Sequence, residues 1–238
     1  MKIELNIKLK EFCVAQFAIV SLILVLGLAS YLFSYFTGYT GLLGFLRLLD
    51  VDAEQSIPTY FSTINLLLSA LLIFIIYRYE KANDLKGFKC WLFLSILFLL
   101  LSVDESASIH EKFSPVYQYL ARAGIIPSLL EKNRWLPFGV LFVLLIGVGL
   151  LPFLKLLPKD TLRRFLISGA VFLMGTIGFE LIGSLLYSSG FDVSRENIVS
   201  LIRLILEEGC EMFGIALFNC ALYREILKRE ISLVISNS

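Results

Sequence analysis

The sequence has little charge and almost no histidine. Charged residues make up 17% of the chain, and His110 is the one histidine in 238 residues. Soluble domains carry about 25% charged residues. One histidine excludes a three-histidine zinc hydrolase and a bis-histidine haem site. Walker and dinucleotide-binding glycine motifs are also absent, so neither haem nor a nucleotide is expected as a cofactor.

The charges that are present do not suggest a nucleic-acid partner. The net charge is +1, and no basic patch with interleaved aromatic residues occurs. The cysteines have no C-x-x-C spacing and lie in or beside apolar runs: Cys13, Cys90, Cys210 and Cys220. They are therefore interpreted as small buried hydrophobic residues, not as disulfides or a thiolate metal site.

Long apolar runs are abundant. The composition is 58% hydrophobic and the mean hydropathy is +0.82. Since a membrane-crossing helix needs about 20 residues, the runs predict an all-α integral membrane protein with one transmembrane domain over residues 1–238. Its six predicted helices span about 12–36, 59–79, 88–111, 135–157, 162–187 and 198–226. The third is extended through Glu111 because no helix breaker precedes Pro115.

The distribution of lysine and arginine predicts the orientation of these helices. The basic residues concentrate in segments 1–11, 78–89, 155–164 and 224–229, whereas the alternate loops carry fewer. Basic loops tend to stay on the cytoplasmic side. Both termini are therefore predicted to be cytoplasmic.

Several acidic residues interrupt the predicted spans. A helix rises about 1.5 Å per residue. Asp104 therefore lies roughly 24 Å from the inner end of the third predicted helix, and Glu180 lies roughly 27 Å from the inner end of the fifth. Glu207 lies roughly 14 Å below the outer end of the sixth helix. These depths place acids from three helices in the outer half of the bilayer.

Burying so many acids needs compensation. An acidic residue at mid-helix costs about 2.5–3.5 kcal/mol. Helical spacing puts Asp104, Ser108 and Glu111 on one face, and it puts Glu207, Glu208 and Glu211 within an arc about 100° wide. The pattern predicts one buried acidic site whose groups are protonated, hydrated or neutralised by cations. Asn65 and Arg203 are predicted to support this site.

Two simpler interpretations remain open. Arg203 and Glu207 are four residues apart on one helix and can form a purely structural ion pair. If the third helix ends early, Asp104, Glu105 and Glu111 lie at the outer water interface.

The first functional hypothesis is a divalent metal site. An oxygen-rich site favours Fe, Mn, Mg or Ca over zinc and copper. Di-iron and di-manganese sites in helical bundles usually also use Glu-x-x-His pairs, which are missing because residue 107 is alanine. An enzyme of this kind would act on a lipid or a quinone-like substrate, with Glu180 or Glu211 as the base. The candidate ligands are Asp104, Glu105, His110, Glu111, Glu180, Glu207, Glu208 and Glu211.

Two hypotheses from other classes compete with the metal site. In a proton- or cation-coupled transporter, the acids would carry the ion. The nearly apolar inner halves of the third and fifth helices argue against a polar path through the membrane. In a membrane assembly or scaffold protein, the acids would only fix helix packing or bind a partner.

The motifs also carry a resemblance. The sequence contains an acidic stretch, Asp52 and Glu54, that leads into I-P-T at 57–59 and the Phe61–Ser62 pair. It then contains D-E at 104–105, H-E at 110–111 and E-E-x-x-E-M-x-G at 207–214. In these motifs the chain resembles an uncharacterised group of bacterial multi-pass inner-membrane proteins. The resemblance covers helices two to six. It implies that these residues act together in a bacterial inner membrane, and it implies no activity.

Overall fold

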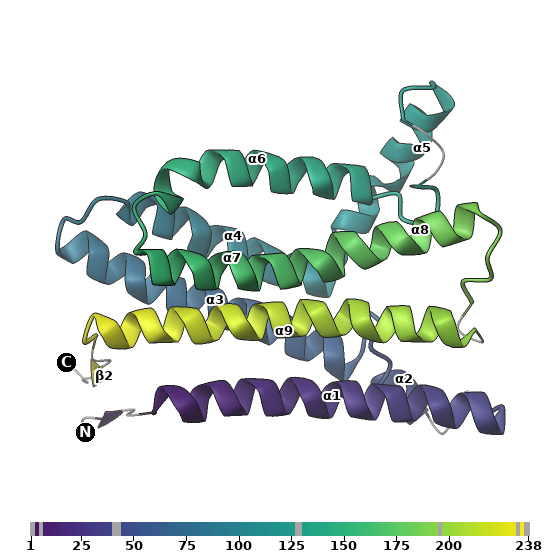
Figure 1. Cartoon of the computed structure of the whole chain (residues 1–238), viewed down its shortest axis with the longest axis horizontal. Helices are drawn as coiled ribbons and strands as arrows, with labels where there is room; N and C mark the ends of the chain where they lie inside the picture. Colours follow the sequence, from purple (N-terminus) through teal and green to yellow (C-terminus); the bar gives the residue numbers. More distant parts are fainter. Residues whose placement is uncertain are drawn as a thin grey trace.

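Long helices lie side by side along one axis in the computed structural model (Figure 1). The structure describes residues 3–4, 7–39, 44–126, 130–194, 197–231 and 234–235. The long helices are α1 (Leu9–Thr37), α3 (Ile57–Ala82), α4 (Phe88–Ala107), α6 (Leu136–Leu154), α7 (Lys159–Leu173) and α9 (Ile198–Lys228). A π-helical segment, Met174–Phe179, joins α7 to α8 (Glu180–Ser188) without a break.

Short elements lie at the two ends of this bundle. Near one end are α2 (Phe45–Leu48), the 3-10 turn His110–Phe113 and α5 (Ser114–Arg122). At the other end, β1 (Ile3–Glu4) pairs antiparallel with β2 (Val234–Ile235), which places both termini together (Figure 1).

Within the described residues, five helical segments are long and apolar enough to cross a membrane: α1, α3, α4, α6 and the continuous α7–α8. The prediction of an all-helical membrane protein is therefore confirmed. The sixth predicted span corresponds to α9, which lies alongside the others (Figure 1). Its outer half carries Arg203, Glu207, Glu208 and Glu211, which make it more polar than the other five. The count of six spans and the orientation of the termini stay predictions.

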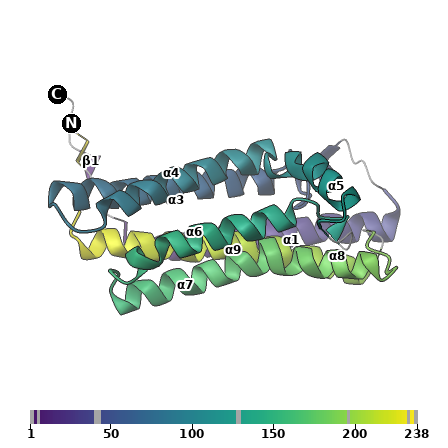
Figure 2. The same cartoon turned by 90° about the horizontal axis from the view of Figure 1, so that it is seen from above.

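Helix α9 is the centre of the packing. It contacts α1, α3 and α7, and seen from above it runs between the α3–α4 pair and α7 (Figure 2). Toward the end that holds the termini, Leu222 and Ile226 of α9 pack with Ile73 and Ile76 of α3 and with Trp91 of α4. This apolar cluster fills the bundle near that end. The end that holds the termini is called the inner end below.

Two glycines allow α7–α8 and α9 to approach very closely. A Cβ atom built on Gly214 would lie 2.6 Å from the backbone nitrogen of Phe172. A Cβ on Gly175, in the π segment, would lie 2.7 Å from the carbonyl oxygen of Glu207. Small residues at such crossings let helix backbones touch in a membrane. Backbone contact at this point fixes where the acidic side chains of α9 lie.

A buried amide network joins α3 to α9 between the acidic residues and the inner end. The Asn219 Nδ2 donates to Asn65 Oδ1 at 2.7 Å, and the Ser69 hydroxyl donates to Asn219 Oδ1 at 2.7 Å. Asn65 was predicted to support the acidic site. It contacts Asn219 and Ser69, and its own Nδ2 is buried without a hydrogen-bond partner in the described residues, so its support of the acidic site stays a prediction.

A network of ion pairs ties three helices together at the inner end. The Arg229 guanidinium, just past α9, donates to Glu80 of α3 at 2.9 Å and to Glu225 of α9 at 2.6 Å. Glu225 also accepts from the Thr161 hydroxyl of α7 at 2.8 Å. Asp160 of α7 pairs with Arg164, Arg224 and Lys228. These lysines and arginines belong to the basic segments that predicted the orientation, but their acidic partners were not predicted from the sequence.

The predicted continuation of the third helix through Glu111 was wrong, because α4 ends at Ala107. Ser108 adopts a left-handed conformation with φ 48° and ψ 47°, and its N–H donates to the Asp104 carbonyl at 2.7 Å. The Asp104 carboxylate then accepts the backbone N–H of His110 at 2.8 Å. Since the helix stops here, Asp104, Ser108 and Glu111 do not share a helical face.

Candidate carboxylate site

Acidic residues from three helices gather in the half of the bundle away from the termini. Glu105 comes from α4, Glu180 from the start of α8, and Glu207, Glu208 and Glu211 from α9. Glu211 precedes Glu225 by 14 residues, which corresponds to about 21 Å along α9. Two polar layers, the acidic site and the inner ion-pair network, are therefore separated by less than the roughly 30 Å of a hydrocarbon core.

Asp104 and His110 form one edge of the site. The His110 Nδ1 lies 3.0 Å from Asp104 Oδ2, and both side chains are partly exposed. Burial lowers the pKa of His110, but the hydrogen bond and the negative charge of Asp104 outweigh it, so the pKa lies above its ordinary value of 6.5. The ring also packs edge-on against Trp135, with centroids 5.0 Å apart. The pair acts as a cap that fixes the end of α4.

A pH-dependent stability is expected from this pair. Because folding raises the pKa of His110, its stabilisation is complete below the unfolded pKa and is lost as the pH rises through the folded pKa. The His110→Gln variant keeps a neutral donor but cannot titrate. The difference in melting temperature between wild type and variant in detergent is expected to be larger at about pH 6 than at about pH 9. An equal difference at both pH values would contradict the ion pair.

Arg203 and Glu207 form a buried ion pair on α9, as the spacing of four residues predicted. The Arg203 guanidinium also donates to the Phe179 carbonyl at 3.2 Å. It lies flat against Gly183 of α8, where a Cβ atom would lie 3.1 Å from Arg203 Cζ. Arg203 therefore neutralises Glu207 and joins α9 to α8.

Glu180 is held by residues that precede α6. The Asn133 amide donates to the Glu180 carboxylate and, at 2.9 Å, to the Glu180 backbone carbonyl. Lys132 adds a positive charge near Glu180 and Glu207, and burial together with the charge of Arg203 lowers the pKa of Lys132. As a candidate base, Glu180 is thus already engaged by a donor.

The remaining three carboxylates, one on α4 and two on α9, are near enough to interact electrostatically. Glu105 of α4 interacts electrostatically with both Glu208 and Glu211 of α9. In the described part of the chain, none of the three accepts a hydrogen bond or forms an ion pair. This group, Glu105, Glu208 and Glu211, is called the carboxylate triad below.

Other predicted members of the site lie apart from the triad. Glu111 leaves the end of α4 and meets the Glu54 carboxyl, and burial together with that acid raises the pKa of Glu111. Ser108 lies at the end of α4, where it adopts the left-handed conformation. Among the residues that the structure describes, no three His, Cys, Asp or Glu side chains already converge closely enough to hold a metal ion.

Several residues near the site escaped the sequence analysis. Asn133, Lys132 and Trp135 come from the loop before α6. Asp52, from the loop before α3, interacts with Glu207 and Glu208, and it belongs to the motif that carries the resemblance. Loop residues have no helical phase, so their spacing carried no signal. The sole usable hint was a cluster of amide and basic residues directly before an apolar run.

A family model described as a domain of unknown function (DUF8692) matches residues 17–226. The chain belongs to the DUF8692 family. The match to this DUF8692 model includes the triad, the Arg203–Glu207 pair and most of the inner ion-pair network. No curated protein and no solved structure matches the chain.

Proposed function

We propose that this chain is a six-span protein of the bacterial inner membrane, with both termini cytoplasmic, that binds a hard divalent cation at the carboxylate triad in exchange for protons. The observation that carries the proposal is the triad itself. Three acids from α4 and α9 interact electrostatically with one another, and in the described residues none of them forms an ion pair, although His110 acts on Glu105 from the edge of the site. Glu180 and Glu207, in contrast, each have a donor.

Electrostatics supports an exchangeable occupant. Two ionised carboxylates about 5 Å apart repel by about 3 kcal/mol at an effective dielectric constant of about 20. Three ionised carboxylates in one group are therefore unfavourable without protons or a cation. Protons neutralise the group at low pH, and a divalent cation does so at higher pH.

The chemistry of the triad selects the class of cation. Carboxylate oxygens suit Ca²⁺, Mg²⁺, Mn²⁺ and Fe²⁺, and Ca²⁺ tolerates irregular, flexible ligand sets. Because the side chains do not already converge on a metal position, binding requires Glu208 and Glu211 to turn toward Glu105. The proton-loaded and cation-loaded forms then differ in how α4 packs against α9.

Calorimetry tests this proposal. Protein purified without chelator is titrated with Ca²⁺, Mg²⁺ or Mn²⁺ in two buffers of different ionisation heat, and protons are expected to be released on binding. The Glu208→Gln, Glu211→Gln double variant is expected to bind at least about tenfold more weakly. Glu230→Gln, at an exposed position beyond α9, is the control and should match wild type. The proposal is wrong if wild type contains no metal, releases no proton and binds as weakly as the double variant.

A second candidate is proton- or cation-coupled transport, which one observation favours. The Asn65–Ser69–Asn219 network continues the polar groups of α9 from the triad toward the inner end. Below it, Leu222 and Ile226 pack against α3, so a transport cycle would have to open this apolar cluster. Ion flux in liposomes distinguishes the two candidates. A transporter moves cations across the liposome membrane, whereas a binding protein binds cations in its purified form and produces no flux.

A further inference from the structure

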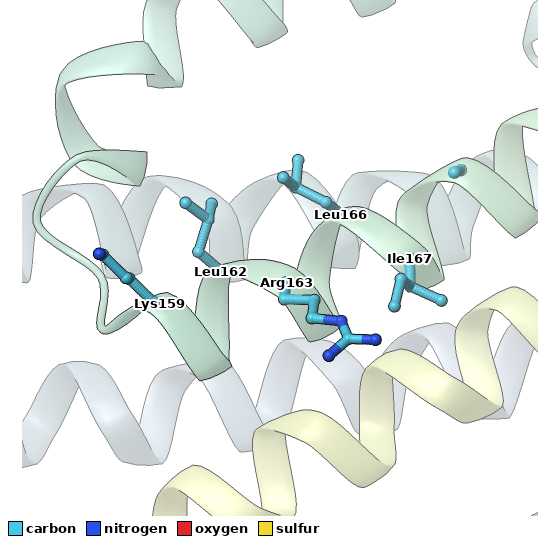
Figure 3. Close-up of a pocket in the computed structure, with 6 residues that line it drawn as sticks. Lys159, Leu162, Arg163, Leu166 and Ile167 are labelled. Atoms are coloured by element: carbon cyan, nitrogen blue, oxygen red, sulfur yellow. The ribbon is translucent and has the colours of Figure 1, made fainter.

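A groove of about 390 Å³ lies along the first turns of α7 (Figure 3). Its lining combines apolar side chains with two cations at the inner end of the helix. Leu166 and Ile167 are 55% and 46% exposed. The lining residues are Lys159, Leu162, Arg163, Leu166, Ile167 and Ala170.

The two cations of the groove differ from the other basic residues around them. Arg164, Arg224 and Lys228 all pair with Asp160. Lys159 and Arg163 have exposed side chains, and neither makes an ion pair within the described residues. They are four residues apart, so they lie on the same face of α7 with their Cβ atoms about 5–6 Å apart. Their positive charge is available to an external anion.

We propose that this groove binds an anionic phospholipid from the inner leaflet. Its phosphate binds both Lys159 and Arg163, whose charged ends point apart in Figure 3 and turn toward the same phosphate on binding. The first part of an acyl chain lies along Leu162, Leu166 and Ala170. From Arg163 to Ala170 the helix rises about 10 Å, so the apolar wall begins directly beside the charged end. Basic pockets on the cytoplasmic side of membrane helices bind anionic head groups in this way.

The apolar wall distinguishes a lipid from a soluble anion. A free phosphate ester would satisfy the two cations but would make no contact with the apolar side chains of the groove. A phospholipid satisfies both parts of the groove, because its head group and acyl chain are covalently joined in the same order as the cations and the leucines. The proposal uses none of the residues of the carboxylate triad.

Native mass spectrometry of the full chain tests the proposal. The protein is released from mixed micelles containing phosphatidylglycerol and phosphatidylcholine, and retention of phosphatidylglycerol is expected. The Lys159→Gln, Arg163→Gln double variant is expected to bind phosphatidylglycerol about thirtyfold more weakly, since each cation near the membrane surface contributes about a factor of five. Glycerol 3-phosphate in excess should not displace the lipid.

Two control variants complete the experiment. Lys86→Gln with Lys89→Gln removes two exposed cations at the same end of the bundle but outside the groove, and it should retain wild-type binding. Lys159→Arg with Arg163→Lys keeps both charges and should also retain it, which separates loss of charge from misfolding. Equal retention of the two lipids, an unchanged preference in the double glutamine variant, or displacement by glycerol 3-phosphate would each overturn the proposal.

Discussion

Replacing Arg229 by methionine is expected to lower the free energy of unfolding by about 3–5 kcal/mol, because it leaves buried carboxylates without their partner. Arg229 contacts both Glu80 and Glu225, whose side chains are 8% and 3% exposed. The guanidinium also lies 5.9 Å from the centre of the Trp91 ring. Its removal therefore affects α3, α4 and α9 together. Denaturation in detergent micelles, followed by circular dichroism, measures the loss.

Lys228→Met is the matched control for this experiment. Lys228 also pairs with Glu225, at 2.9 Å, but its side chain is 40% exposed. Exposed ion pairs contribute about 0–1 kcal/mol, so a small loss is expected. If the free energy of unfolding falls by the same amount in both variants, the buried ion pairs of Arg229 contribute no more than the exposed pair of Lys228. Methionine keeps most of the apolar volume of either side chain, so the comparison isolates charge and hydrogen bonding.

The helices were predictable because their apolar runs are long, whereas their ends were not. Glu111 was assigned to the third helix since no proline intervenes before Pro115. The actual signal was Asp104, whose carboxylate captures the backbone N–H of His110 and turns the chain at Ser108. Such side-chain capture competes with helix continuation but leaves no periodic pattern.

The site was predictable where it depended on one helix. The Arg203–Glu207 pair follows from a spacing of four residues, and the sequence analysis anticipated it. The Asn219–Asn65 contact joins residues 154 positions apart, and the Arg229–Glu80 contact joins residues 149 apart. Neither has a local signature, because helix neighbours in space follow from packing and not from spacing along the chain. The sequence therefore predicted which carboxylates lie in the bundle, but it did not predict their partners on other helices.

Gly214→Ala is expected to destabilise the protein, against the usual helix preference for alanine. Alanine normally gains up to about 1 kcal/mol over glycine in a helix. At Gly214 the new Cβ atom would lie 2.6 Å from the nitrogen and 2.7 Å from the Cα of Phe172, both backbone atoms that cannot rotate away. Helices α7 and α9 must therefore separate, and overpacking of this kind costs about 1–3 kcal/mol.

Gly169→Ala, on α7, is the control, and its stability is expected to change in the opposite direction from that of Gly214→Ala. A Cβ atom there meets nothing within 4 Å in the described part of the chain, so this variant should be as stable as wild type or slightly more stable. The same denaturation experiment in micelles compares both variants, and equal effects would contradict the close crossing.

The Gly214 variant also tests the link between packing and site. Gly175 lies against Glu207 and Glu211, so separating α7–α8 from α9 displaces these two acids relative to Glu180 and disturbs the backbone contact that positions them. Cation affinity should then fall in Gly214→Ala and stay unchanged in Gly169→Ala. A Gly214→Ala variant that is destabilised but binds cations normally would show that the triad depends on the α4–α9 contact alone. The glycine crossing would then support the fold without setting the geometry of the acids.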